Sequence, residues 1–123
     1  MMDKNIEHCL KAYKALEKLC TAYDSVWNNC RQFNSVFSHF SVKTTQLQMF
    51  AYNQTILLDP VMVDNKRSVV INPAQLNMNM QLLAAEIDVL ITQMEELLQT
   101  ECSGRTGFNA RFMEAAAETR TNR

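Results

Sequence analysis

The 123-residue sequence is poor in glycine and proline, with two of each, and both glycines lie beyond residue 103. Because these residues most often end helices and form tight turns, their scarcity favours long uninterrupted helices. No run of 18 apolar residues occurs, so we expect no membrane insertion. The charges nearly balance, with 12 basic and 13 acidic residues. No basic stripe indicates direct nucleic-acid binding.

The sequence also lacks the motifs of common enzymes. His8 and His39 are the two histidines. His8 precedes Cys9, but adjacent helical positions point in different directions and do not form a catalytic pair. No glycine-rich phosphate loop and no zinc-binding H-E-x-x-H motif is present. We therefore expect a protein that is not an enzyme, with no catalytic residues, cofactor, metal or small-molecule substrate.

The four cysteines, Cys9, Cys20, Cys30 and Cys102, form no C-x-x-C pair and match no zinc-ligand spacing. The first three share the apolar stripe of the N-terminal helical region, which predicts buried structural thiols rather than disulfides or metal ligands. The N-terminus lacks the layout of a signal peptide, so we expect an intracellular protein. A reducing compartment also disfavours disulfides.

The most regular feature of the chain is a heptad pattern between residues 72 and 101. Asn72 is a good N-cap, Pro73 suits the first helical position, and Ser103 and Gly104 follow the last periodic residue. These signals predict a helix over residues 73–101. Its apolar residues recur at alternating steps of four and three, as in a coiled coil. We call them the heptad seam: Leu76, Met80, Leu83, Ile87, Leu90, Met94 and Leu97.

Residues 3–58 also show helical periodicity, with Lys and Glu on the face opposite the apolar stripe. Glu7 and Lys11 are spaced for an i,i+4 ion pair. At Phe33 the apolar pattern steps once by three residues, as in a coiled-coil stutter. The region is therefore either one long helix or two helices, the second starting near residues 24–25. Asp59 precedes a proline, and this order ends the helix.

Two segments with weaker patterns lie outside these helices, one between them and one after the second. Between residues 59 and 72, two apolar, largely β-branched triplets flank a polar turn, which predicts an extended connection or a small β-hairpin. Residues 104–123 have Phe108, Phe112 and Ala115 at helical spacing and then a polar end, so we expect a flexible or partly helical tail. The main helical unit therefore covers residues 1–103.

These segments predict an all-α protein of long antiparallel helices, a helical hairpin or bundle with coiled-coil-like packing. Met78, Leu82, Val89 and Leu98 widen the apolar arc of the second long helix beyond the heptad seam. A helix apolar over so wide an arc contacts more than one neighbour. We therefore expect a subunit of a hetero-oligomer of helical proteins, whose partner interface contains the heptad seam together with Trp27, Phe33 and Phe40.

Residues 23–63 share a spaced apolar pattern: Trp27, the apolar segment 33–40, Leu47, and the aliphatic-proline-aliphatic segment 56–63. With this pattern the middle of the chain resembles the family of the Mediator head-module subunit numbered eight. The resemblance implies a non-enzymatic helical subunit in the nucleus that packs against other helical subunits and relays activators to RNA polymerase II. The chain departs from the family after residue 63, where the expected longer connection is missing.

Two other classes share the same sequence pattern. One is a structural subunit of a vesicle-tethering, kinetochore or microtubule-associated complex, which would be cytoplasmic if it is not a Mediator-like nuclear protein. The other is a self-contained homodimeric helical bundle that binds a small ligand. Periodicity alone does not separate these three hypotheses.

Overall fold

The computed structural model describes residues 4–22, 30–58, 73–102, 104 and 106–120. These residues form four helices: α1 (Lys4–Ala22), α2 (Arg31–Leu58), α3 (Pro73–Thr100) and α4 (Thr106–Glu118). No strand occurs in these ranges, so the all-α prediction is confirmed. No helix within them is long and apolar enough to cross a membrane.

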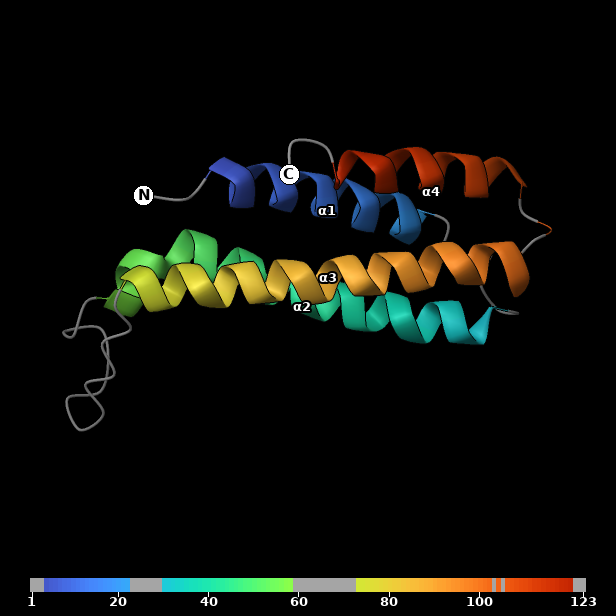
Figure 1. The fold of residues 1–123 in the computed structure, drawn as a ribbon. Coiled ribbons are helices and arrows are strands. Elements are labelled where there is room, and N and C mark those ends of the chain that lie inside the picture. The colour runs from blue at the N-terminus through green and yellow to red at the C-terminus, as the bar shows by residue number, and fades with distance from the viewer. Residues whose placement is uncertain (1–3, 23–29, 59–72, 103, 105, 121–123) are drawn as a thin grey trace.

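The helices lie in two layers, with α1 and α4 on one side and α2 and α3 on the other (Figure 1). Near its start, α2 contacts the end of α3, since the backbone nitrogen of Phe33 donates a hydrogen bond to Glu101. Further along, Lys43 of α2 pairs with Glu86 of α3 at 2.9 Å. The two helices are therefore antiparallel. Successive helices alternate in direction, as in an up-down-up-down four-helix bundle (Figure 1).

A single core fills the space between the layers. Tyr13, Phe33, Phe40 and Phe112 are its largest fully buried side chains. Tyr13 meets Phe40 edge to face at 6.3 Å between ring centroids, and Phe33 meets Phe112 in the same way at 5.9 Å. Such edge-to-face pairs add to the free energy gained by burial. Both layers therefore depend on the aromatic side chains of α2.

The N-terminus of α2 is capped from a distance. The backbone nitrogens of Gln32 and Phe33 donate to the two carboxylate oxygens of Glu101, at 3.0 and 2.9 Å. The first N–H groups of a helix have no partner within the helix, and a carboxylate also interacts favourably with the positive end of the helix dipole. Glu101 therefore stabilises the start of α2 from the end of α3.

The predicted helical region 3–58 is two helices. Cys30 is not helical and α2 begins at Arg31, so a single continuous helix is wrong for this region. The alternative start near residues 24–25 lies outside the described residues. By contrast, α3 runs from Pro73 to Thr100, within one residue of its predicted bounds, because proline favours the first position of a helix.

The segment that we expected to be a tail contributes to the core. Phe108, Phe112 and Ala116 of α4 are buried, so the side chains on both sides of residue 103 share one packed interior. The side-chain amide of Asn109 donates to the carbonyls of Leu98 and Cys102, which holds the start of α4 against the end of α3. The predicted extended or β-hairpin connection over residues 59–72 lies outside the described residues.

The cysteines divide into two kinds. Cys9 and Cys20 on α1 are free and buried, so the prediction of structural thiols is confirmed for these two. For Cys30 it is wrong, since Cys30 forms a disulfide with Cys102, with the two Cα atoms 6.1 Å apart. The antiparallel packing of α2 and α3 brings them together from 72 residues apart in the sequence. The sequence spacing gave no sign of this juxtaposition.

Candidate interaction surface

The heptad seam points into the bundle. Leu76, Met80, Leu83, Ile87 and Met94 are buried, and Leu90 and Leu97 are partly buried and pack against the core. Phe33 and Phe40 are also fully buried, while Trp27 lies outside the described residues. The structure therefore closes the seam within the chain. A partner that meets the folded bundle therefore reaches little of the seam beyond the partly buried Leu90 and Leu97.

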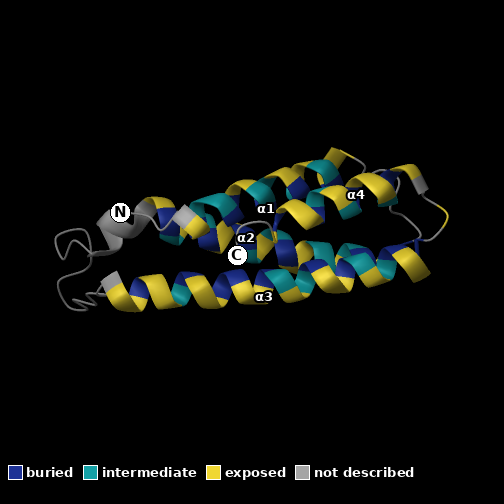
Figure 2. Ribbon diagram, turned by 45° about the horizontal axis from the view of Figure 1, so that its top comes forward, coloured by how far each residue is buried: buried dark blue, intermediate teal, exposed yellow. Residues whose placement is uncertain are grey.

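The wider apolar arc of α3 splits into two parts. Leu98 is fully buried, so this part of the arc serves contacts within the bundle. Met78, Leu82 and Val89 are instead more than half exposed. Figure 2 shows the outer side of α3 as mainly exposed residues and its inner side as buried ones. The apolar side chains outside the core are therefore the ones that a partner can reach.

The exposed large hydrophobic residues of the described chain all lie on α2 and α3. They number six, three on each helix, and each is 56–59% exposed: Val42, Met49, Tyr52, Met78, Leu82 and Val89. The register set by Lys43 opposite Glu86 places Val42 level with Val89 and Met49 level with Leu82, to within about one helical turn. We call these six residues the outer apolar face.

Few charges accompany the outer apolar face. Arg31 and Lys43 are the charged residues of α2, a helix of 28 residues, and residues 73–85 of α3 contain none. By contrast, α1 carries a charge in every turn except the last: Lys4, Glu7, Lys11, Lys14, Glu17 and Lys18. Protein interfaces are depleted in charge at their centre and enriched in methionine and aromatic residues. The outer side of the α2/α3 layer has this composition.

A groove between α2 and α3 runs along the same side of the molecule. One hollow in it, of about 520 Å³, has Val36 and Leu97 among its lining and Gln32, Ser35 and Glu96 around them. Both Val36 and Leu97 are only partly buried. The volume falls in the range of ligand pockets, but the hollow is open to solvent rather than enclosed. An extended partner surface fits such a hollow better than a small ligand does.

The second hollow in the groove is smaller, about 240 Å³, and lies nearer the start of α3. Phe50 and Leu82 line it together with Lys43 and Glu86. Because Lys43 and Glu86 pair with each other at 2.9 Å, this end of the groove is electrically neutral. Glu96 at the other end has no ion-pair partner among the described residues.

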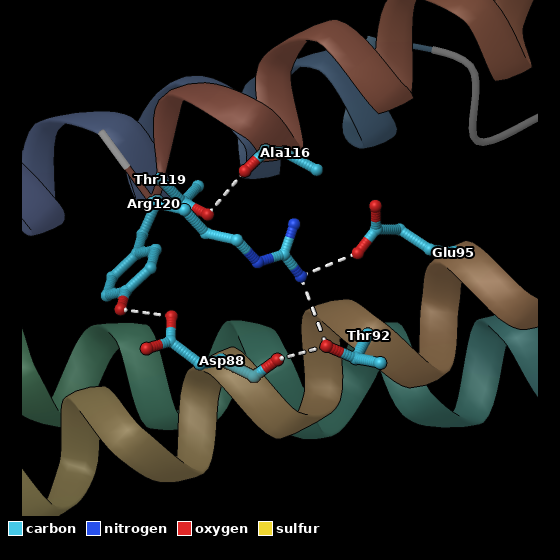
Figure 3. Close-up of polar contacts among 7 residues, drawn as sticks. Asp88, Thr92, Glu95, Ala116, Thr119 and Arg120 are labelled. Carbon is cyan, nitrogen blue, oxygen red and sulfur yellow. Dashed lines mark hydrogen bonds and ion pairs between the residues drawn. The ribbon is translucent and has the colours of Figure 1, made fainter. Parts of the chain in front are cut away.

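The opposite side of α3 carries a polar cluster that joins it to α1 and α4 (Figure 3). The hydroxyl of Tyr13 donates to a carboxylate oxygen of Asp88 at 2.8 Å. Arg120 pairs with Glu95 at 2.6 Å and donates to the Thr92 hydroxyl at 3.1 Å. These groups are occupied by one another, and charge-assisted bonds of this kind hold helices together. The cluster therefore serves to join α3 to α1 and α4.

In the part of the chain that the structure describes, the remaining nucleophilic and metal-binding side chains form no shared site. Burial, with a smaller contribution from Glu17, raises the pKa of the Cys20 thiol to about 12, so Cys20 stays protonated and unreactive at neutral pH. His39 is exposed on α2, and His8 is partly buried on α1. Within the described ranges, no group of three or more His, Cys, Asp or Glu side chains is arranged to hold a metal ion.

Sequence reasoning missed three residues of the outer apolar face: Val42, Met49 and Tyr52. They lie off the stripe that continues through Phe33 and Phe40, so the periodicity placed them in solvent. The signal that could have found them is the lack of charge on α2, which leaves this helix without the solvated face that α1 has.

Comparisons with known proteins found no match to a family model, a curated protein or a solved structure.

Proposed function

We propose that the protein is a non-enzymatic helical subunit of a multi-protein complex and that it joins its partners through the outer apolar face. The observation that carries the proposal is the one-sided distribution of exposed large hydrophobic residues, all on α2 and α3 in the described part of the chain. Exposed large apolar side chains gathered on one layer of a folded protein are a feature of interaction sites. The scarcity of charge around it supports the same assignment.

The size of the face indicates what kind of association to expect. Burying the exposed half of six large side chains contributes roughly 5–10 kcal/mol. The loss of translational and rotational freedom costs about 4–15 kcal/mol. The six side chains by themselves therefore support at most moderate affinity. This suits a subunit that is held by several neighbours in an assembly better than a tight pair.

Within this class, we propose a Mediator-like coactivator subunit in the nucleus as the first candidate. Its support is the sequence resemblance over residues 23–63, of which Phe33, Phe40 and Leu47 are buried on the inner face of α2. Those residues therefore act in this bundle through packing. A subunit of a vesicle-tethering, kinetochore or microtubule-associated complex is the alternative, and a homodimeric bundle is the third.

The Cys30–Cys102 disulfide bears on location. Disulfides persist in oxidising compartments, whereas the nucleus and cytoplasm keep most thiols reduced. A nuclear or cytoplasmic site of action therefore requires that the bundle keep its fold with these two cysteines reduced. Glu101 and Asn109 hold the same end of the molecule by hydrogen bonds that do not depend on the sulfurs.

Affinity purification with mass spectrometry tests the proposal. The bait is the full chain, compared with Val42→Arg plus Val89→Arg on the outer apolar face. The matched control is Ala15→Arg plus Ala110→Arg, at exposed positions of α1 and α4. We expect specific partners to be lost only from the first variant. Partners from the transcription machinery would favour the Mediator-like candidate, and cytoskeletal or tethering proteins the alternative. Equal recovery by both variants would refute docking through this face.

A further inference from the structure

The two hollows in the groove between α2 and α3 lie at a defined distance from each other. Along α3, one hollow is lined by residues 79–86 and the other by residues 93–100. Their centres are therefore about two heptads apart, or roughly 20 Å at 1.5 Å per residue. Residues two heptads apart on a helix point in nearly the same direction. One face of a single helix can therefore place a side chain in each hollow.

The two hollows of the groove differ in charge. At the hollow near the start of α3, the charges of Lys43 and Glu86 neutralise each other. At the other hollow, the carboxylate of Glu96 has no ion-pair partner among the described residues. Gln32, Ser35 and Thr100, which line the same hollow, are uncharged. An occupant therefore gains from one basic side chain at this end and from none at the other.

We infer that this groove binds an amphipathic helix of a partner protein, with two large apolar anchors about two heptads apart and a basic residue beside the anchor that enters the Glu96 hollow. The inference rests on the proposed function and names the kind of partner it requires. Binding of an amphipathic helix in an apolar groove is a recurring mode of recognition, in which side chains on one helix face supply the anchors.

A second copy of the chain fits the groove less well. The exposed apolar residues of α2 are Val42, Met49 and Tyr52, and those of α3 are Met78, Leu82 and Val89. No two on the same helix are two heptads apart. Each helix would therefore fill one hollow and leave the other open. None of these six residues has a lysine or arginine three or four positions away, one helical turn, that would meet Glu96.

A designed peptide tests the inference directly. The probe is a fluorescein-labelled helical peptide of about 24 residues, rich in Ala and Gln, with two Leu residues two heptads apart and one Lys a turn from the second Leu. The control peptide has the same composition, but its second Leu is moved two positions along, onto the opposite face. By fluorescence anisotropy, we expect the first peptide to bind the full chain at least about tenfold more tightly.

Charge reversal at Glu96 tests whether the groove prefers a basic side chain at this end. Glu96→Lys should weaken binding of the Lys peptide at least about fivefold, and a peptide with Glu in place of Lys should recover it. Glu114→Lys, at an exposed position of α4, is the matched control and should change neither peptide's affinity. Equal binding of the two Leu spacings, no binding at about 1 mM, or equal effects of the two charge reversals would each overturn the inference.

The two proposals fail in different ways. If Val42→Arg plus Val89→Arg abolishes the recovery of cellular partners but the peptides are not discriminated, the outer apolar face docks a partner and the groove inference is wrong. If that variant recovers every partner, the proposed function itself is wrong.

Discussion

The two layers of the bundle meet solvent in different ways. The outer sides of α1 and α4 are charged, and Lys11 there pairs with Glu7 at 3.7 Å, as its i,i+4 spacing predicts. The outer side of α2 and α3 instead exposes large apolar residues and few charges. Both layers bury their inner faces in one core. The difference therefore lies outside the core, and the demands of folding do not explain it.

On α2 and α3, the residues needed for stability and the residues available for binding lie on different sides of the helix. The inner residues of α2 and α3 hold the four helices together, so their removal should unfold the chain. The outer residues contact little within the chain, so their removal should leave the fold intact and affect only what the chain binds. Substitutions on the two sides of one helix therefore test whether its inner residues serve stability and its outer residues serve binding.

The largest effect is expected for Phe33→Ala. Phe33 is fully buried and contacts Phe108 and Phe112 across the bundle, so its loss leaves a cavity between the two layers. We expect a loss of about 3–5 kcal/mol in the free energy of unfolding, measured by urea denaturation with circular dichroism. Val42→Ala, on the outer side of the same helix, should change it by less than about 0.5 kcal/mol. Similar losses for the two variants would contradict the division into inner and outer faces.

The cysteines extend the comparison, because the α2/α3 layer holds a disulfide and α1 holds free thiols. Alkylation of the denatured, unreduced protein should modify Cys9 and Cys20 only. Reduction should lower the free energy of unfolding by about 2–4 kcal/mol, because the bond closes a long loop in the unfolded chain. A Cys9→Ala plus Cys20→Ala variant serves as control and should show the same loss on reduction. Alkylation of all four cysteines without reduction would contradict the bond.

Local signals in the sequence explain what could be predicted of the fold. The start of α3 follows from Pro73, and the positions of its apolar seam follow from the heptad spacing. The long-range polar contacts could not be predicted, because they join residues far apart in the chain: Phe33 and Glu101 are 68 positions apart, and Tyr13 and Asp88 are 75 apart. Pairing of this kind depends on helix register, which periodicity does not determine.

The same limit applies to the candidate interaction surface. The apolar arc of α3 indicated that some of its residues would remain for a partner, and Met78, Leu82 and Val89 are indeed exposed. The heptad seam could not be assigned to the core or to a partner interface without knowing where α1 and α4 pack. The segment containing Phe108 and Phe112 decided this, because α4 covers the core together with α1.

The smallest effect concerns Cys20 on α1, whose buried thiol has its pKa raised from 9.0 to about 12 by desolvation and, to a lesser extent, by Glu17. Above pH 9 the unfolded chain releases this proton, while the folded chain retains it until about pH 12. The unfolded state is therefore favoured as pH rises through that window, at about 1.4 kcal/mol per pH unit. Between pH 8 and pH 10, we expect the free energy of unfolding of Cys20→Ala to fall by about 1.4 kcal/mol less than that of the unsubstituted protein. Urea denaturation at each pH measures this difference. Identical pH profiles for the two proteins would show that the thiol of Cys20 reaches solvent, and the inner face of α1 would then be less well sealed than that of α2.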